Sequence, residues 1–145
     1  MRKLTCNSSV NKLKLNKSFI PCPVVDNEEI FRNGIFEFNI TRMIEHIRVN
    51  PKEFIVEEVA VDSFHQTYSS INEEHMANVV IGEPVIIAEI APCQYNLIDG
   101  NHRMEKARRL GITKLNAYRL KVHQHIQFLT STGAYKAYVE YWNGK

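Results

Sequence analysis

Long apolar runs are missing from this 145-residue sequence, and their absence excludes the usual membrane segments. No stretch approaches the roughly 20 apolar residues that a transmembrane helix needs. The polar, lysine-containing N-terminus also lacks the apolar core of a signal peptide. We therefore expect a cytoplasmic protein that makes no membrane contact.

The sequence also lacks a strong excess of charge and any metal-type spacing of cysteines. Its formal net charge is +2, which is too small to indicate strong non-specific binding to nucleic acid. Cys6, Cys22 and Cys93 are far apart and odd in number, and this spacing does not match a zinc motif. Reduced, unpaired thiols in a reducing compartment fit it best.

What the sequence does contain is a strand–turn–helix pattern over residues 95–111. Residues 95–98 predict a short buried strand and Asp99-Gly100 a tight turn, with a helix following that ends at Gly111, a typical C-cap residue. Asp-Gly also opens hairpins, but the residues after it are strong helix formers without alternation. The apolar residues of the helix share one face: Met104, Ala107 and Leu110.

The first turn of this helix carries two basic side chains, His102 and Arg103. Positive charge at a helix N-terminus opposes the macrodipole, at a cost of about 0.3–1 kcal/mol each. The free backbone N–H groups there favour an anion instead, and Gly100 lets another group approach the backbone. A bound phosphate would make this arrangement favourable. In the structural alternative, Asp99 caps the helix and pairs with Arg103 four residues on.

The turn Asp99-Gly100-Asn101-His102-Arg103, followed by an alanine and Leu110-Gly111, resembles the signature turn of the ParB/sulfiredoxin superfamily, which includes the ParB N-terminal-like and ParB-like nuclease domains. The resemblance extends from about residue 59 to residue 122. It implies an α/β (α+β) domain with a small mixed sheet flanked by helices. It also implies a bound nucleotide such as ATP, ADP or CTP, whose phosphates contact Gly100, Asn101, His102 and Arg103.

Three residues of this turn are candidate catalytic groups. Asp99 could hold Mg²⁺ against phosphate oxygens or act as a base. His102 could donate to phosphate or shuttle a proton near neutral pH, and Arg103 could grip phosphate oxygens with its planar fork. Phosphoryl transfer also needs a positioned base, for which the candidates are Glu57, Glu58, Asp62 and Glu83. We expect the remaining histidines to be ordinary, since they lack metal-ligand spacing: His65, His75, His123 and His125.

Two activities of the superfamily do not fit this sequence. Sulfiredoxins resemble this turn but carry a catalytic cysteine just before the histidine, where this chain has Asn101. Partition proteins follow the module with a helix-turn-helix domain, yet only about two dozen residues follow Val122. The remaining hypotheses are a phosphodiesterase or nuclease and a small-molecule kinase. The alternatives are a non-catalytic, nucleotide-responsive regulatory module and a DNA-associated partition-like protein without its own helix-turn-helix.

The rest of the chain divides into an N-terminal extension, residues 1–53, and a ParB/sulfiredoxin-like domain with a C-terminal helical segment, residues 54–145. The start of the extension fits either an edge strand or disorder, and residues 35–40 predict a strand after the Asn33-Gly34 turn. Thr41 is the expected cap of a helix to residue 49, and Ser70 begins a capping box for a helix to about residue 80. Further strands are predicted at 56–61, 85–90 and 115–122, with one or two helices at 123–141.

Overall fold

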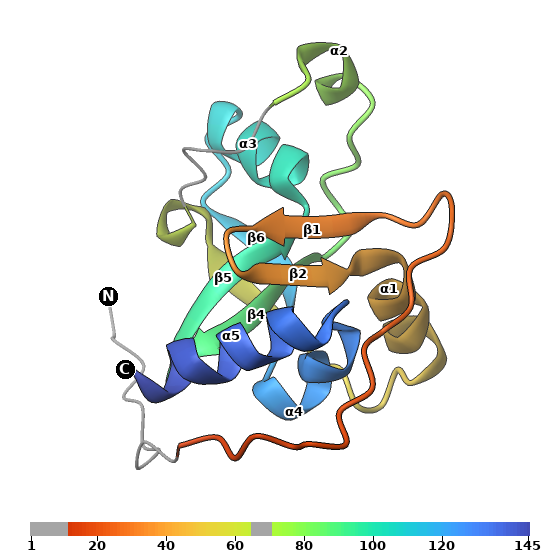
Figure 1. Cartoon of the computed structure of the whole chain (residues 1–145). Helices are drawn as coiled ribbons and strands as arrows, with labels where there is room; N and C mark the ends of the chain where they lie inside the picture. The colour runs from red at the N-terminus through yellow and green to blue at the C-terminus, as the bar shows by residue number, and fades with distance from the viewer. Residues whose placement is uncertain (1–11, 65–70) are drawn as a thin grey trace.

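The computed structural model describes residues 12–64 and 71–145, and it has the expected mixed α and β composition (Figure 1). In chain order the elements are β1 (Ile30–Asn33), β2 (Phe36–Asn39), α1 (Ile40–Val49), β3 (Val56–Ala60), η1 (Val61–Ser63), α2 (Glu73–Met76), β4 (Val85–Ala91), β5 (Gln94–Asp99), α3 (Asn101–Arg109), β6 (Lys114–Leu120), α4 (Val122–His125), η2 (Ile126–Phe128) and α5 (Thr132–Asn143).

The central sheet has four strands in the order β3-β6-β4-β5. β4 and β6 are parallel, whereas β3 pairs with β6 and β5 pairs with β4 in the antiparallel sense. Strands β1 and β2 form a separate antiparallel hairpin, which turns at Asn33-Gly34 as predicted. The small mixed sheet flanked by helices is therefore confirmed.

Helices cover both faces of the central sheet, which explains the continuous apolar run of β4. Val85 and Ile87 pack on one face with Met104 and Ala107 of α3. The intervening Ile86 and its same-face neighbours on β4 pack on the other face, against α1 and α5. The aromatic stripe of α5 is buried there: Tyr135, Tyr138 and Trp142.

The described part of the N-terminal extension shares this second core. Phe38 and Met43 are fully buried in the same cluster as Ile86. The Leu13 N–H donates to Asn143 Oδ1 at 2.7 Å, and Asn143 Nδ2 donates to the Leu13 carbonyl at 3.0 Å. These two bonds fix the extended segment against the end of α5 without forming a strand there.

Two predicted helix starts are wrong. Asn39, rather than Thr41, caps α1, because its Oδ1 accepts from the Arg42 N–H at 3.0 Å. Thr41 Oγ1 instead accepts from the Glu29 N–H at 2.7 Å. Helix α2 is capped by Asn72 and ends at Met76, so it is far shorter than the predicted helix to residue 80. Ser70, the predicted start of its capping box, lies outside the described residues.

The prediction of reduced, unpaired cysteines holds for Cys22 and not for Cys93. Cys22 is a free, buried thiol, but the expectation of an unpaired thiol is wrong for Cys93, which takes part in a disulfide. Within residues 12–64 and 71–145, no helix is long and apolar enough to cross a bilayer.

His125 is a fully buried titratable group in the second core. Its Nε2 donates to the Glu89 carbonyl at 2.7 Å, and the Tyr138 hydroxyl donates to the same carbonyl at 2.7 Å. Burial lowers the pKa of His125 to about 4, against the raising effect of the bond to Glu89. His125 is therefore neutral in the folded protein at neutral pH.

We predict that acid weakens the fold through His125. Because the pKa is lower in the folded than in the unfolded state, the stabilisation is complete above about pH 6.5 and is lost as pH falls toward 4. The loss should reach about 3 kcal/mol of unfolding free energy, at about 1.4 kcal/mol per pKa unit. Urea unfolding at several pH values measures this loss. His125→Gln should flatten the slope, whereas the exposed-site control His123→Gln should retain it, and equal slopes in all three proteins would refute the assignment.

Candidate functional site

A cavity of about 800 Å³ lies where β5 ends and α3 begins. Its walls come mainly from three parts of the chain, with Ile40 and Glu83 in addition: residues 29–34 at the hairpin, residues 75–80 around the end of α2, and residues 97–103. All five residues of the predicted phosphate turn, from Asp99 to Arg103, line it. The cavity is therefore open to a ligand at the place that the sequence motif indicates.

Gly100 makes this junction sterically feasible. Its φ is +99°, and it occupies the N-cap position of α3 without any side-chain cap. A Cβ built on Gly100 would lie 2.9 Å from the Val85 Cβ and closer still to Cγ1, distances that no real Cβ tolerates. The interpretation of Asp99 as the helix cap is therefore wrong, and glycine is required by both backbone conformation and packing.

We predict that Gly100→Ala destabilises the protein more than Gly111→Ala does. Both glycines have positive φ, so both substitutions carry backbone strain of about 1–3 kcal/mol, but a Cβ on Gly111 would meet nothing within 4 Å. The clash with Val85 should add about 1–3 kcal/mol at Gly100 alone. Chemical denaturation of the two variants isolates this packing contribution, and equal losses would show that Val85 does not press on the turn.

Arg103 is already engaged by the protein. Its Nη2 donates to Asp99 Oδ2 at 3.2 Å, with the two side chains only 15% and 14% exposed. Its Nη1 donates to the carbonyls of Glu83, at 3.1 Å, and of Pro84. The predicted Asp99–Arg103 pair thus forms. Arg103 clamps the start of α3 to the segment before β4, and its contribution to ligand binding is limited to the donors that remain.

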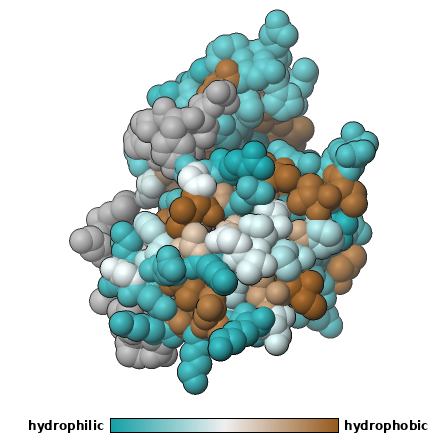
Figure 2. All heavy atoms as spheres, viewed as in Figure 1, coloured by the Kyte–Doolittle hydropathy of each residue, from teal (hydrophilic) through white to brown (hydrophobic). Residues whose placement is uncertain are grey.

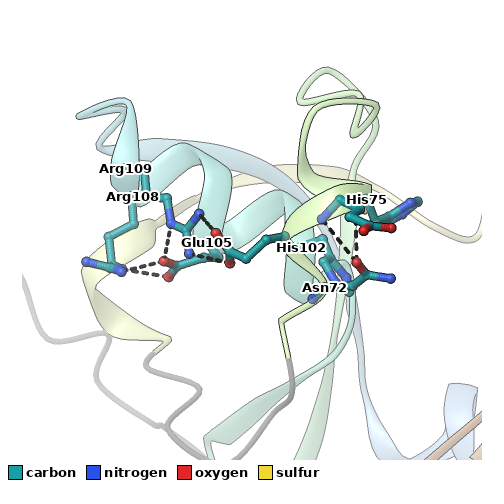
Figure 3. Close-up of polar contacts among 8 residues, drawn as sticks. Asn72, His75, His102, Glu105, Arg108 and Arg109 are labelled. Carbon is teal, nitrogen blue, oxygen red and sulfur yellow. Dashed lines mark hydrogen bonds and ion pairs between the residues drawn. The ribbon is translucent and has the colours of Figure 1, made fainter.

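His102 is engaged as well, but by the backbone of another segment. Its Nε2 accepts from the Asn72 N–H at 3.0 Å, which requires a neutral ring with the proton on Nδ1 (Figure 3). The His75 ring meets it edge-on, with centroids 5.0 Å apart. Burial lowers the pKa of His102, and His75 lowers it further, while Glu73 opposes both. His102 therefore enters the cavity wall uncharged.

Three carboxyl groups line the cavity, those of Glu29, Glu83 and Asp99, and sequence reasoning missed Glu29. Burial raises the pKa of Asp99, against the lowering influence of Arg103. Burial also raises the pKa of Glu29, and the Asp99 charge raises it further. Bonds from its own N–H to Thr41 and from the Ile40 N–H to its carbonyl at 2.9 Å fix the Glu29 backbone. No local pattern around residue 29 marks it as functional.

Of the four base candidates drawn from the sequence, Glu83 lines the cavity. Glu57 pairs with Arg119 across β3 and β6, with Oε2 and Nε 2.9 Å apart. Glu58 lies on β3 and Asp62 on η1, and neither contributes to the cavity lining. The structure therefore favours Glu29 and Glu83 over the three acids near β3 as proton acceptors for a ligand.

The first turn of α3 supplies the donors that the side chains do not. The first α3 hydrogen bond runs from the Met104 N–H to the Gly100 carbonyl at 2.9 Å. Helix geometry leaves the preceding N–H groups, of Asn101, His102 and Arg103, without intrahelical acceptors. Asn101 Oδ1 is buried and has no hydrogen-bond partner among the described residues. This turn therefore combines backbone donors with a side-chain amide oxygen that has no partner among the described residues.

The donor set at Asp99 does not by itself fit a protein-held Mg²⁺. Within the described ranges, no three His, Cys, Asp or Glu side chains gather as metal ligands. One Asp99 oxygen already accepts from Arg103, while Mg²⁺ takes six oxygen ligands in near-ideal octahedral geometry.

Comparison with protein-family models, with curated proteins and with solved structures gave no match to this chain. The functional argument therefore depends on the residues and the geometry of the cavity.

Proposed function

We propose that this chain is a ParB/sulfiredoxin-type domain that binds a nucleotide or another phosphate ester in the cavity at the start of α3. The observation that carries the proposal is the open cavity at a helix N-terminus whose N-cap, Gly100, has φ +99°. The strand–turn–helix junction has the order that the resemblance implies.

The phosphate would contact mainly the backbone. Three N–H groups of the first turn, with the positive end of the helix dipole, favour an anion. The Asp99–Arg103 pair is electrically balanced, and of the five N–H donors of the guanidinium three are used in the contacts described above. Arg103 therefore assists binding and also holds the turn in place.

The remainder of the cavity suits the organic part of such a ligand. Phe31 of the hairpin and Val79 and Val80 beyond α2 are apolar residues in the cavity lining. Its volume of about 800 Å³ lies in the range of roughly 300–1,000 Å³ typical of small-molecule sites. A polar end and an apolar wall in one cavity favour a nucleotide over a bare phosphate ion.

Hydrolysis of the bound ester is a second candidate function, and Glu29 is the observation that favours it. Glu29 lines the cavity, and a carboxylate whose pKa lies above its ordinary value is a better proton acceptor for an attacking water. The water oxygen would bond to phosphorus, and the ester oxygen would leave with its bonding electron pair and take a proton from solvent. If Glu29 does not act as the base, the alternative function is a non-catalytic domain that responds to nucleotide binding.

We predict that Asn101→Asp abolishes phosphate-ester binding. Asp at this position places a negative charge where the ligand phosphate would lie, but favours the helix dipole. Asn116→Asp is the matched control, since it adds the same charge at an exposed position of β6. Thermal unfolding is followed with ATP, ADP, CTP and inorganic phosphate, with and without Mg²⁺, on all three proteins.

At a hundredfold excess over Kd, a ligand adds about 2.7 kcal/mol of stability, or roughly 5–10 °C in Tm for a domain of this size. Wild type and Asn116→Asp should show this shift, and Asn101→Asp should not. The absence of any shift in wild type, or an equal shift in Asn101→Asp, would contradict the proposal. Assaying the same samples for ester hydrolysis, with Glu29→Gln added, separates catalysis from binding.

A further inference from the structure

One face of α3 holds a separate segment, residues 72–80, which we call the flap. His102, Lys106 and Arg109 follow at intervals of four and three, so they lie on one side of the helix. His102 accepts from the Asn72 N–H, Lys106 Nζ donates to the Val79 carbonyl at 3.0 Å, and Arg109 forms a two-pronged ion pair with Glu73 at 2.8 Å. The basic face of α3 therefore fixes the flap.

The flap is held chiefly by these polar contacts. Met76 is its buried apolar residue, at 7% exposure, whereas Val80 is 59% exposed. The upper part of the molecule, where α2 and α3 lie in Figure 1, is predominantly hydrophilic on the face drawn in Figure 2. Segments with few buried apolar contacts and exposed hydrogen bonds open at low free-energy cost.

The flap also forms one wall of the ligand cavity. His75, Asn78, Val79 and Val80 line the cavity opposite the hairpin. Displacement of the flap would therefore widen the cavity, and its return would narrow the cavity around a bound ligand.

The contact between His102 and Asn72 exists only while the imidazole is neutral. Nε2 needs a lone pair to accept from the Asn72 N–H, and a proton on Nε2 would place two donors against each other. Protonation would also put positive charge beside the His75 ring, 5.0 Å away (Figure 3). The charged and titratable groups around His102 come from α2, from α3 itself and from the hairpin: Glu73, His75, Arg103, Glu105, Lys106, Glu29 and Arg32.

We propose that the flap is a gate over the cavity, closed by neutral His102 and released when His102 is protonated. The biological role of the gate rests on the proposed function, but the release itself does not require a ligand. Glu73 of α2 opposes release, because its negative charge attracts the protonated His102 ring. Both carboxylate oxygens of Glu73 also accept hydrogen bonds from Arg109.

Amide hydrogen exchange of the ligand-free protein at pH 7.5 and 5.5 tests the gate. After correction for intrinsic exchange rates, protection in residues 72–80 should fall about tenfold more than protection in β4 and α5. His102→Gln presents a neutral amide oxygen near the Nε2 position and cannot be protonated, so its flap should lose this pH response. His123→Gln, an exposed histidine elsewhere, is the matched control and should behave like wild type.

Proton NMR titration of the His102 ring gives a second measurement on the same sample. Its midpoint should coincide with the pH at which flap protection falls. Unchanged wild-type protection, a retained pH response in His102→Gln, or a midpoint that differs from that of His102 would each overturn the gate. Because no ligand is present, these results are independent of the phosphate titration, and failure of one proposal is distinguishable from failure of the other.

Discussion

The close approach of the Gly100 backbone to Val85 is the constraint on which the rest of this structure depends. Val85 begins β4 and is fully buried, so the turn after β5 must pass over it without a Cβ. This contact sets where α3 begins, and thus where the N–H groups of its first turn point. The clamp from Arg103 to Asp99 and to the Glu83 and Pro84 carbonyls secures the same turn from the other side.

Burial of Arg103 explains why its side chain mainly binds groups of the protein rather than a phosphate. A guanidinium that is 15% exposed must be paired, because an unpaired buried charge is costly. The protein provides that pairing itself, through one carboxylate and two carbonyls. The anion site is thereby shifted from the arginine fork to the backbone, where donors are already oriented before a ligand arrives.

The elements with strong local signals were predictable from the sequence. The branched apolar run of β4, the turn at Asp99-Gly100 and the helix that ends before Gly111 follow from short-range patterns. The pairing of Asp99 with Arg103 also follows from a spacing of four residues. By contrast, the cap of α1 was not predicted, because it is Asn39 rather than Thr41, whose Oγ1 accepts from the Glu29 N–H of a distant segment.

The parts of the site that depend on distant chain segments were not predictable. Glu29 reaches the cavity because the hairpin packs beside the central sheet, and residue 29 has no pattern of its own. His102 binds the Asn72 backbone 30 residues away, so its role as a wall and anchor is set by tertiary structure. Likewise, the charges on α3 predict an exposed basic face from the sequence alone, because the contacts of Lys106 and Arg109 with the flap depend on tertiary structure.

The most direct test of the backbone anion site is a ¹H–¹⁵N NMR titration with inorganic phosphate. We predict saturable shifts concentrated at the amides of Asn101, His102 and Arg103. The start of α5 serves as an internal reference, because Ser131 Oγ already accepts from the Ala134 N–H there at 2.9 Å. Shifts of equal size at both helix starts, or none that saturate, would contradict the account.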